Sequence, residues 1–172
     1  MKKLIEINPI EDRQELLDLR RSEKLGCSIS VNYIYFLTEE FITYPSGQSA
    51  ILYIGEAMRK SENTGVRFVQ HITPKKETGS DSGNNLILSH FFHNNWKIGL
   101  VVFESNQSRK LIEREMIYWH IQQFGAPPIA QGKIPLDKKG KNRNKDIFEY
   151  LESNKQSVAK NGDFLRNINN RV

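Results

Sequence analysis

YIYFLTEEFITYPSGQSAILYIGEAMRKSENTGVRFVQHI, the stretch from Tyr33 to Ile72, decides the fold. Two runs rich in β-branched and aromatic residues, Ser28–Thr38 and Ala50–Gly55, read as strands. Between them, Pro45-Ser46-Gly47 is a strong turn signal. The pattern predicts an antiparallel hairpin with a long loop.

The segment after the second run reads as a short helix over Thr64–Ile72. Arg67 and His71 are four residues apart in it, so they share one helix face and point the same way. Gly55 ends the preceding strand, at a place where a side chain would be sterically unwelcome.

The rest of the chain adds two helices and one strand. A helix is predicted over Ile7–Lys24, with Asn8-Pro9 at its start. Trp96–Glu104 reads as a third strand, and Ser108–Phe124 as the longest helix. The fold class predicted is α+β, a small three-stranded antiparallel sheet flanked by helices. The expected divisions are an N-terminal helical extension (1–27), a core (28–132) with an inserted loop (73–95), and a basic helical or mobile C-terminal tail (133–172).

Composition sets broad limits on the function. The chain has 172 residues, one cysteine and a formal net charge of +5. This length suits one domain, and the positive charge is compatible with a polyanionic partner. A single cysteine cannot form an internal disulfide, which favours a cytoplasmic protein. The N-terminus lacks the apolar core of a signal peptide, and no run is long enough to span a membrane.

The order of these motifs resembles the GIY-YIG nuclease family, in its restriction-endonuclease branch. Tyr33-Ile34-Tyr35 stands where the family has its first motif, and Tyr53-Ile54-Gly55 reproduces the second. The arginine and histidine of the family's next helix are matched by Arg67 and His71, and its later glutamate by Glu115. The resemblance covers roughly residues 31–131.

Three features depart from the family pattern. Tyr33 replaces the leading glycine of the first motif. The spacing between the motifs, and from Tyr53 to Arg67, is longer than in compact members. The family's late asparagine has no match, and Gln131 stands at roughly its place.

The resemblance implies hydrolysis of DNA phosphodiesters with Mg²⁺ or Mn²⁺. Glu115 would be the metal ligand, and Arg67 would bind the phosphate through its forked guanidinium. Tyr35, as the first choice, would orient or deprotonate the attacking water, and Tyr53 would hydrogen-bond the phosphate or a water on the metal. His71 would shuttle a proton or hold a tyrosine hydroxyl.

The choice of Glu115 over Glu113 rests on the helix pattern. The two lie on nearly opposite helix faces, so only one can face the cleft. Glu115 has Leu111 and Trp119 at four-residue steps, which places it along an apolar stripe where a solvated carboxylate is unexpected. Glu115 is therefore the predicted catalytic carboxylate.

The expected partner is double-stranded DNA, and cutting both strands would need a homodimer or two binding events. Candidate backbone contacts lie in the loops and the lysine-rich tail: Arg59, Lys60, Lys75, Lys76, Lys138, Lys139, Lys141 and Arg143. Two rival interpretations remain: a nucleic-acid-binding module on the same fold that has lost catalysis, and an unrelated α+β interaction domain.

Overall fold

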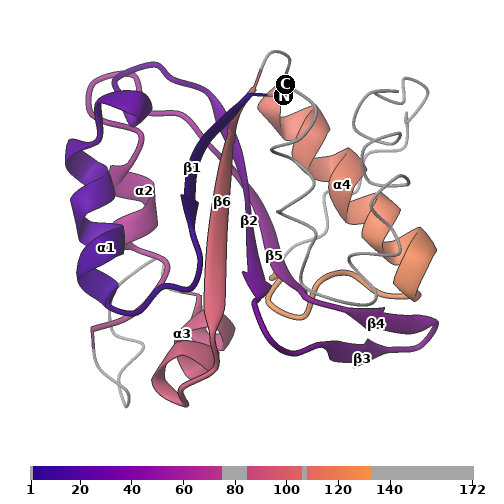
Figure 1. Cartoon of the computed structure of the whole chain (residues 1–172). Coiled ribbons are helices and arrows are strands. Elements are labelled where there is room, and N and C mark those ends of the chain that lie inside the picture. Colours follow the sequence, from indigo (N-terminus) through magenta and orange to yellow (C-terminus); the bar gives the residue numbers. More distant parts are fainter. Residues whose placement is uncertain (1, 75–84, 106–107, 133–172) are drawn as a thin grey trace.

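A computed structural model of the chain describes residues 2–74, 85–105 and 108–132. Its centre is a four-stranded antiparallel sheet in the order β1-β6-β2-β5 (Figure 1). The strands are β1 (Lys3–Ile7), β2 (Val31–Leu37), β5 (Ile51–Ala57) and β6 (Ile98–Glu104). This confirms the α+β class but gives one strand more than the three expected.

Helices cover both faces of the sheet. On one face lie α1 (Arg13–Asp18), α2 (Val66–Val69) and α3 (Leu86–His93), and on the other lies α4 (Arg109–Phe124) (Figure 1). Two short 3₁₀ turns, η1 (Leu19–Arg21) and η2 (Glu23–Leu25), follow α1. No helix in the described ranges is both long and apolar enough to cross a membrane.

The additional strand comes from the segment predicted as a helical extension. β1 pairs with β6, while Leu4, Ile5 and Ile7 pack against the core. The predicted helix over Ile7–Lys24 is therefore wrong at its start. Pairing with β6 satisfies the backbone of β1 and covers the β6 edge, which a lone sequence segment does not reveal.

Helix α1 begins later than predicted because Asp12, rather than Asn8-Pro9, caps it. The Asp12 carboxylate accepts a hydrogen bond from the backbone N–H of Gln14 at 2.9 Å. The Glu15 carboxylate reaches back to the backbone N–H of Asp12 at 3.0 Å, completing a capping box.

The predicted hairpin is present, formed by β2 and β5. Its loop is partly ordered as a second hairpin, β3 (Ile42–Tyr44) with β4 (Gly47–Ser49), whose turn contains Pro45. In the main hairpin Tyr35 lies opposite Tyr53, and Tyr33 lies opposite Gly55. The two family-like motifs are thus direct register partners.

The two-residue alternation of β2 divides its side chains between the two faces. Tyr33 and Tyr35 belong to the core cluster that includes α1, α2 and α3 residues, whereas Ile34 and Phe36 pack with α4. Every residue of β2 is buried, because helices cover the sheet on both sides. The tyrosine side chains therefore point toward α2.

Candidate functional site

Three tyrosines from the main hairpin surround one histidine. The Tyr35 hydroxyl lies 2.9 Å from His71 Nδ1, and the Tyr33 hydroxyl lies 3.2 Å from His71 Nε2. The ring centroid of Tyr53 lies 6.1 Å from that of His71 and 6.0 Å from that of Tyr33. Tyr33, Tyr35 and His71 are buried, and Tyr53 is half-buried. Tyr53 is therefore the tyrosine of the cluster that can meet a ligand.

Helix α2 is held in place from both sides. Phe68 is fully buried, with its ring centroid 5.0 Å from that of Tyr33 in an edge-to-face contact. From α1, the guanidinium of Arg13 donates hydrogen bonds to the carbonyls of Ile72, at 2.7 Å, and Val69, at 3.2 Å. These contacts fix the end of α2 and the segment just after it, which carries His71.

The pKa of His71 is lowered to about 3. Burial is the larger cause, because it disfavours the charged imidazolium, and the positive charge of Arg67 acts in the same direction. His71 is thus a neutral imidazole at any physiological pH, with one nitrogen that donates and one that accepts.

Arg67 is half-buried beside the same tyrosines. Its Nη1 donates to the side-chain oxygen of Gln70 at 3.3 Å. Burial raises the pKa of Tyr33, and the positive charge of Arg67 opposes the rise. Arg67 and His71 therefore act on one cluster, as their spacing predicted, although α2 itself ends at Val69.

The carboxylate whose charge acts on this cluster is that of Glu113, in the second turn of α4. The pKa of Tyr53 is raised first by burial and then by the negative charge of Glu113, while Arg67 opposes the rise. Burial raises the pKa of Glu113 itself to about 7; the charge of Glu56 adds to this shift and that of Arg67 opposes it. Glu113 is half-buried, so it retains access to solvent.

Glu115 occupies a different position on α4. It is buried, at 7% exposure, and it is not among the groups whose charge acts on Tyr53. Two residues along a helix turn the side chain by about 200°, so Glu113 and Glu115 cannot face the same strand. The apolar stripe identified Glu115 as buried, but Glu113 is the glutamate that the structure brings to Tyr53 and Arg67.

The start of α4 is fastened to the central hairpin. The Asn32 side chain donates to the carbonyl of Arg109 at 2.9 Å and accepts from the Ser105 hydroxyl at 2.6 Å. Arg109 also forms an ion pair with Glu56, the residue after Gly55. These contacts set the position of α4, and hence of Glu113 one turn later.

Gln131 contacts the second motif directly. Its side-chain oxygen accepts a hydrogen bond from the backbone N–H of Ile54 at 3.2 Å. The residue at roughly the place of the family asparagine is therefore tied to the strand that carries Tyr53.

Of the predicted DNA contacts, the structure describes two. Lys60 is exposed, and Arg59 forms an ion pair with Glu62 at 3.0 Å in the same loop before α2. The remaining six lie outside the described residues: Lys75, Lys76, Lys138, Lys139, Lys141 and Arg143.

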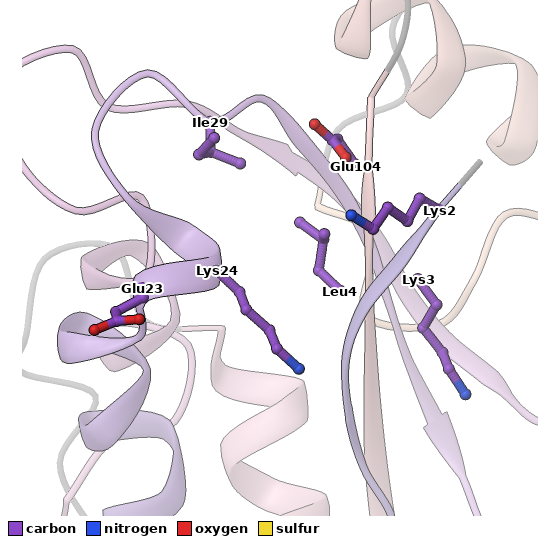
Figure 2. A pocket seen from close by; sticks show the side chains of 7 residues that line it. All are labelled: Lys2, Lys3, Leu4, Glu23, Lys24, Ile29 and Glu104. Atoms are coloured by element: carbon purple, nitrogen blue, oxygen red, sulfur yellow. The ribbon is translucent and has the colours of Figure 1, made fainter.

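A cavity of about 310 Å³ lies elsewhere, at the β1 edge of the sheet (Figure 2). Lys2 and Leu4 of the β1 side face Lys24 of η2 across it, and Lys3 also lines it. Because β6 and β2 separate β1 from β5, this cavity is apart from the tyrosine cluster. Glutamates also line it, so its charge is mixed.

Glu113 and Glu56 are the carboxylates that could hold a divalent cation beside the cluster. In residues 2–74, 85–105 and 108–132 no group of three or more His, Cys, Asp or Glu side chains gathers to form a metal site. Glu113 and Glu56 place two carboxyl groups within electrostatic reach of each other. Their mutual repulsion raises the pKa of Glu113, and a cation beside them would relieve it. Oxygen ligands of this kind suit Mg²⁺ and Mn²⁺.

Two members of the cluster were not identified as site residues from the sequence. Tyr33 was treated as a departure from the family motif, yet its two-residue spacing from Tyr35 places it on the same strand face. Glu56 follows Gly55 directly, and its pairing with Arg109 depends on a contact distant in sequence.

Comparisons of the chain with protein-family models, with curated proteins and with solved structures found no match.

Proposed function

We propose that the protein is a metal-dependent DNA endonuclease of the GIY-YIG type. One observation carries the proposal: the register of β2 and β5 sets Tyr35 opposite Tyr53, His71 hydrogen-bonds Tyr35, and the charges of Arg67 and Glu113 act on Tyr53. A half-buried tyrosine, an arginine and a carboxylate can together orient a water, bind a phosphate and hold a cation, which is what phosphodiester hydrolysis needs.

Each group has a role that follows from its surroundings. Arg67 binds the scissile phosphate and stabilises the charge that develops on it, because a guanidinium fork matches two phosphate oxygens. Tyr53 presents its half-exposed hydroxyl to the attacking water or to the phosphate. Tyr35 was the first choice for activating water, but its side chain is fully buried. In this proposal it supports Tyr53 from the buried side, through its hydrogen bond to His71.

The metal site in this proposal is Glu113, with Glu56 beside it, in place of Glu115. A bound Mg²⁺ or Mn²⁺ supplies Lewis acidity and charge neutralisation at the phosphate. Glu113 holds its position because Asn32 fastens the start of α4 to the sheet. The repulsion between Glu113 and Glu56 favours occupation by a cation.

Restriction-type, sequence-specific cleavage of duplex DNA is the concrete form of the proposal. Two copies of the chain would cut the two strands, either as a homodimer or in two binding events. Gel filtration with and without DNA separates these cases, since a monomer that makes double-strand breaks in one encounter would exclude the homodimer.

The test is incubation of supercoiled, unmethylated plasmid with the protein and Mg²⁺, beside the same reaction in EDTA and beside Arg67→Ala. Discrete fragments that require both Mg²⁺ and Arg67 are expected, and smearing would indicate cleavage without sequence preference. DNA that is bound in a gel shift but not cut under any condition would contradict the proposal and favour a binding module without catalysis.

A further inference from the structure

Arg13 belongs to residues 1–27, the segment expected to lie outside the core, yet its side chain reaches the helix that carries Arg67. Its Nε donates to the carbonyl of Ile72 at 2.7 Å, and its Nη2 donates to the carbonyl of Val69 at 3.2 Å. These two donors lie on one edge of the planar guanidinium, so a single arginine bridges both carbonyls. The N-terminal segment is therefore joined directly to α2 and to the turn that follows it.

The two bridged carbonyls are the ones that the end of a short helix leaves without donors. α2 has only four residues, and Val69 is the last of them. In the part of the chain that the structure describes, no backbone N–H is bonded to the carbonyl of Val69 or of Ile72. A cation at the end of a helix supplies such donors and also interacts favourably with the helix dipole. Among the described residues Arg13 forms no ion pair, so its charge acts on this backbone rather than on a carboxylate.

Helix α3 holds the same segment from its other end. The backbone N–H of Asn85 donates to the carbonyl of His71 at 3.2 Å. The Ser89 hydroxyl accepts from the backbone N–H of Thr73 at 3.0 Å, and His93 Nε2 donates to the Thr73 carbonyl at 2.8 Å. The turn after α2 is thus fixed by side chains and backbone of α3 at its far end, and by Arg13 where it joins the helix.

The bridged carbonyls stand on either side of a site residue. His71 lies between Val69 and Ile72 in the sequence, and Arg67 lies two residues before Val69. The imidazole of His71 is buried, with Nδ1 at 2.9 Å from the Tyr35 hydroxyl. Because the imidazole is attached between the two bridged carbonyls, a shift of that backbone would displace it from Tyr35.

We propose that Arg13 is a positioning residue of the site. By bridging the carbonyls on either side of His71, it sets where the His71 imidazole and the Arg67 guanidinium lie. Helix α1 is then part of the catalytic unit, although the family-like motifs all lie after it. The effect of Arg13 on catalysis rests on the proposed nuclease function, whereas its effect on the position of His71 does not.

The first test is the ¹⁵N NMR spectrum of the histidine side chains in the full chain, with wild type beside Arg13→Gln. The chain has four histidines, and the variants His71→Gln and His120→Gln assign two of them. The His71 signals should shift or broaden in Arg13→Gln, because the bridge is lost. The signals of His120, buried in α4 on the other face of the sheet, should not move and show that the protein is folded.

Arg13→Lys is the second variant. It keeps the positive charge but lacks the planar fork, so it should move the His71 signals less than Arg13→Gln does. Arg20→Gln is the matched control, since it removes an exposed arginine from the same N-terminal segment and should leave the His71 signals unchanged. His71 signals that keep their wild-type positions in Arg13→Gln, or in Arg13→Lys where Arg13→Gln does not fold, would overturn the proposal.

Cleavage kinetics provide the second readout. Arg13→Gln should lower kcat by about 10- to 100-fold with KM unchanged, because misplaced catalytic groups lose rate rather than affinity. Arg13→Lys should recover part of the rate. An unchanged kcat would overturn the catalytic part of the proposal. A wild type that never cuts DNA, with His71 signals that still move in Arg13→Gln, would contradict the nuclease function while supporting Arg13 as the residue that positions His71.

Discussion

The ring of Tyr33 occupies the space that a Cβ atom on Gly55 would need, and the two residues are register partners in the main hairpin. The glycine of the second motif and the tyrosine in the first are thus two parts of one packing arrangement. The ring lies where it can reach His71 because its opposite neighbour has no side chain.

Replacing Gly55 with alanine should destabilise the protein by roughly 1–3 kcal/mol, since the added methyl group forces the Tyr33 ring out of a packed core. Urea unfolding of Gly55→Ala beside wild type measures this. Gly132→Ala is the control, because nothing lies within 4 Å of the Cβ it would add. Equal stability of both variants would show that the Tyr33 ring is not confined.

Arg67→Ala should reduce the cleavage rate by about 100-fold or more, while DNA binding measured with Ca²⁺ in place of Mg²⁺ changes little. Arg67→Lys should rescue only part of the rate, because an ammonium group cannot bind two phosphate oxygens with a planar fork. Arg20→Ala, at an exposed arginine of η1, is the control. Full activity in Arg67→Lys would argue against bidentate phosphate binding.

Lys60→Ala should weaken DNA binding uniformly across sequences and reduce the slope of log K against log salt by about 1. The residue is exposed in the loop before α2. A titration of affinity against salt checks this. Lys97→Ala is the matched control, since Lys97 pairs with Glu11 at 3.2 Å. If both variants keep the wild-type slope, the loop does not contact the DNA backbone.

The stability of the protein should fall as the pH drops from about 6.5 toward 4, in part because of His120. Burial lowers the pKa of this histidine to about 4, and a hydrogen bond to the Ala126 carbonyl opposes the shift. The unfolded chain therefore binds a proton in this window that the folded chain does not, which costs up to about 1.4 kcal/mol per pH unit.

Urea unfolding at several pH values, wild type beside His120→Gln, isolates this contribution. The variant should show a shallower loss of stability between pH 6.5 and 4, and the exposed His90→Gln should follow the wild type. If stability falls equally steeply with pH in wild type and in His120→Gln, then His120 has the same pKa in the folded and the unfolded chain, and this explanation is wrong.

The hairpin could be predicted because its information is local. Alternating β-branched and aromatic residues around a proline turn specify two paired strands. The predicted helix Ser108–Phe124 is present as Arg109–Phe124, and it ends at Gly125 in the left-handed conformation. β1 could not be predicted as a strand, because its five residues gain stability only by pairing with β6, about 95 residues away.

The glutamate was misassigned for a related reason. An apolar stripe on a helix shows which side chains are buried, but not which strand each one faces. Glu115 is buried as the stripe predicted, yet Glu113 is the glutamate whose charge acts on Tyr53 of β5. The start of α4 is held by the contacts of Asn32 and Arg109, which join segments far apart in the sequence.

The most direct test of the proposed site compares Glu113→Gln with Glu115→Gln in Mg²⁺-dependent plasmid cleavage. Both changes remove one negative charge from the same helix and keep nearly the same shape. Glu113→Gln should lose cleavage by about 100-fold or more, because it removes a metal ligand, whereas Glu115→Gln, once shown to be folded, should keep wild-type activity within a few-fold. Loss of cleavage in Glu115→Gln alone would contradict the account.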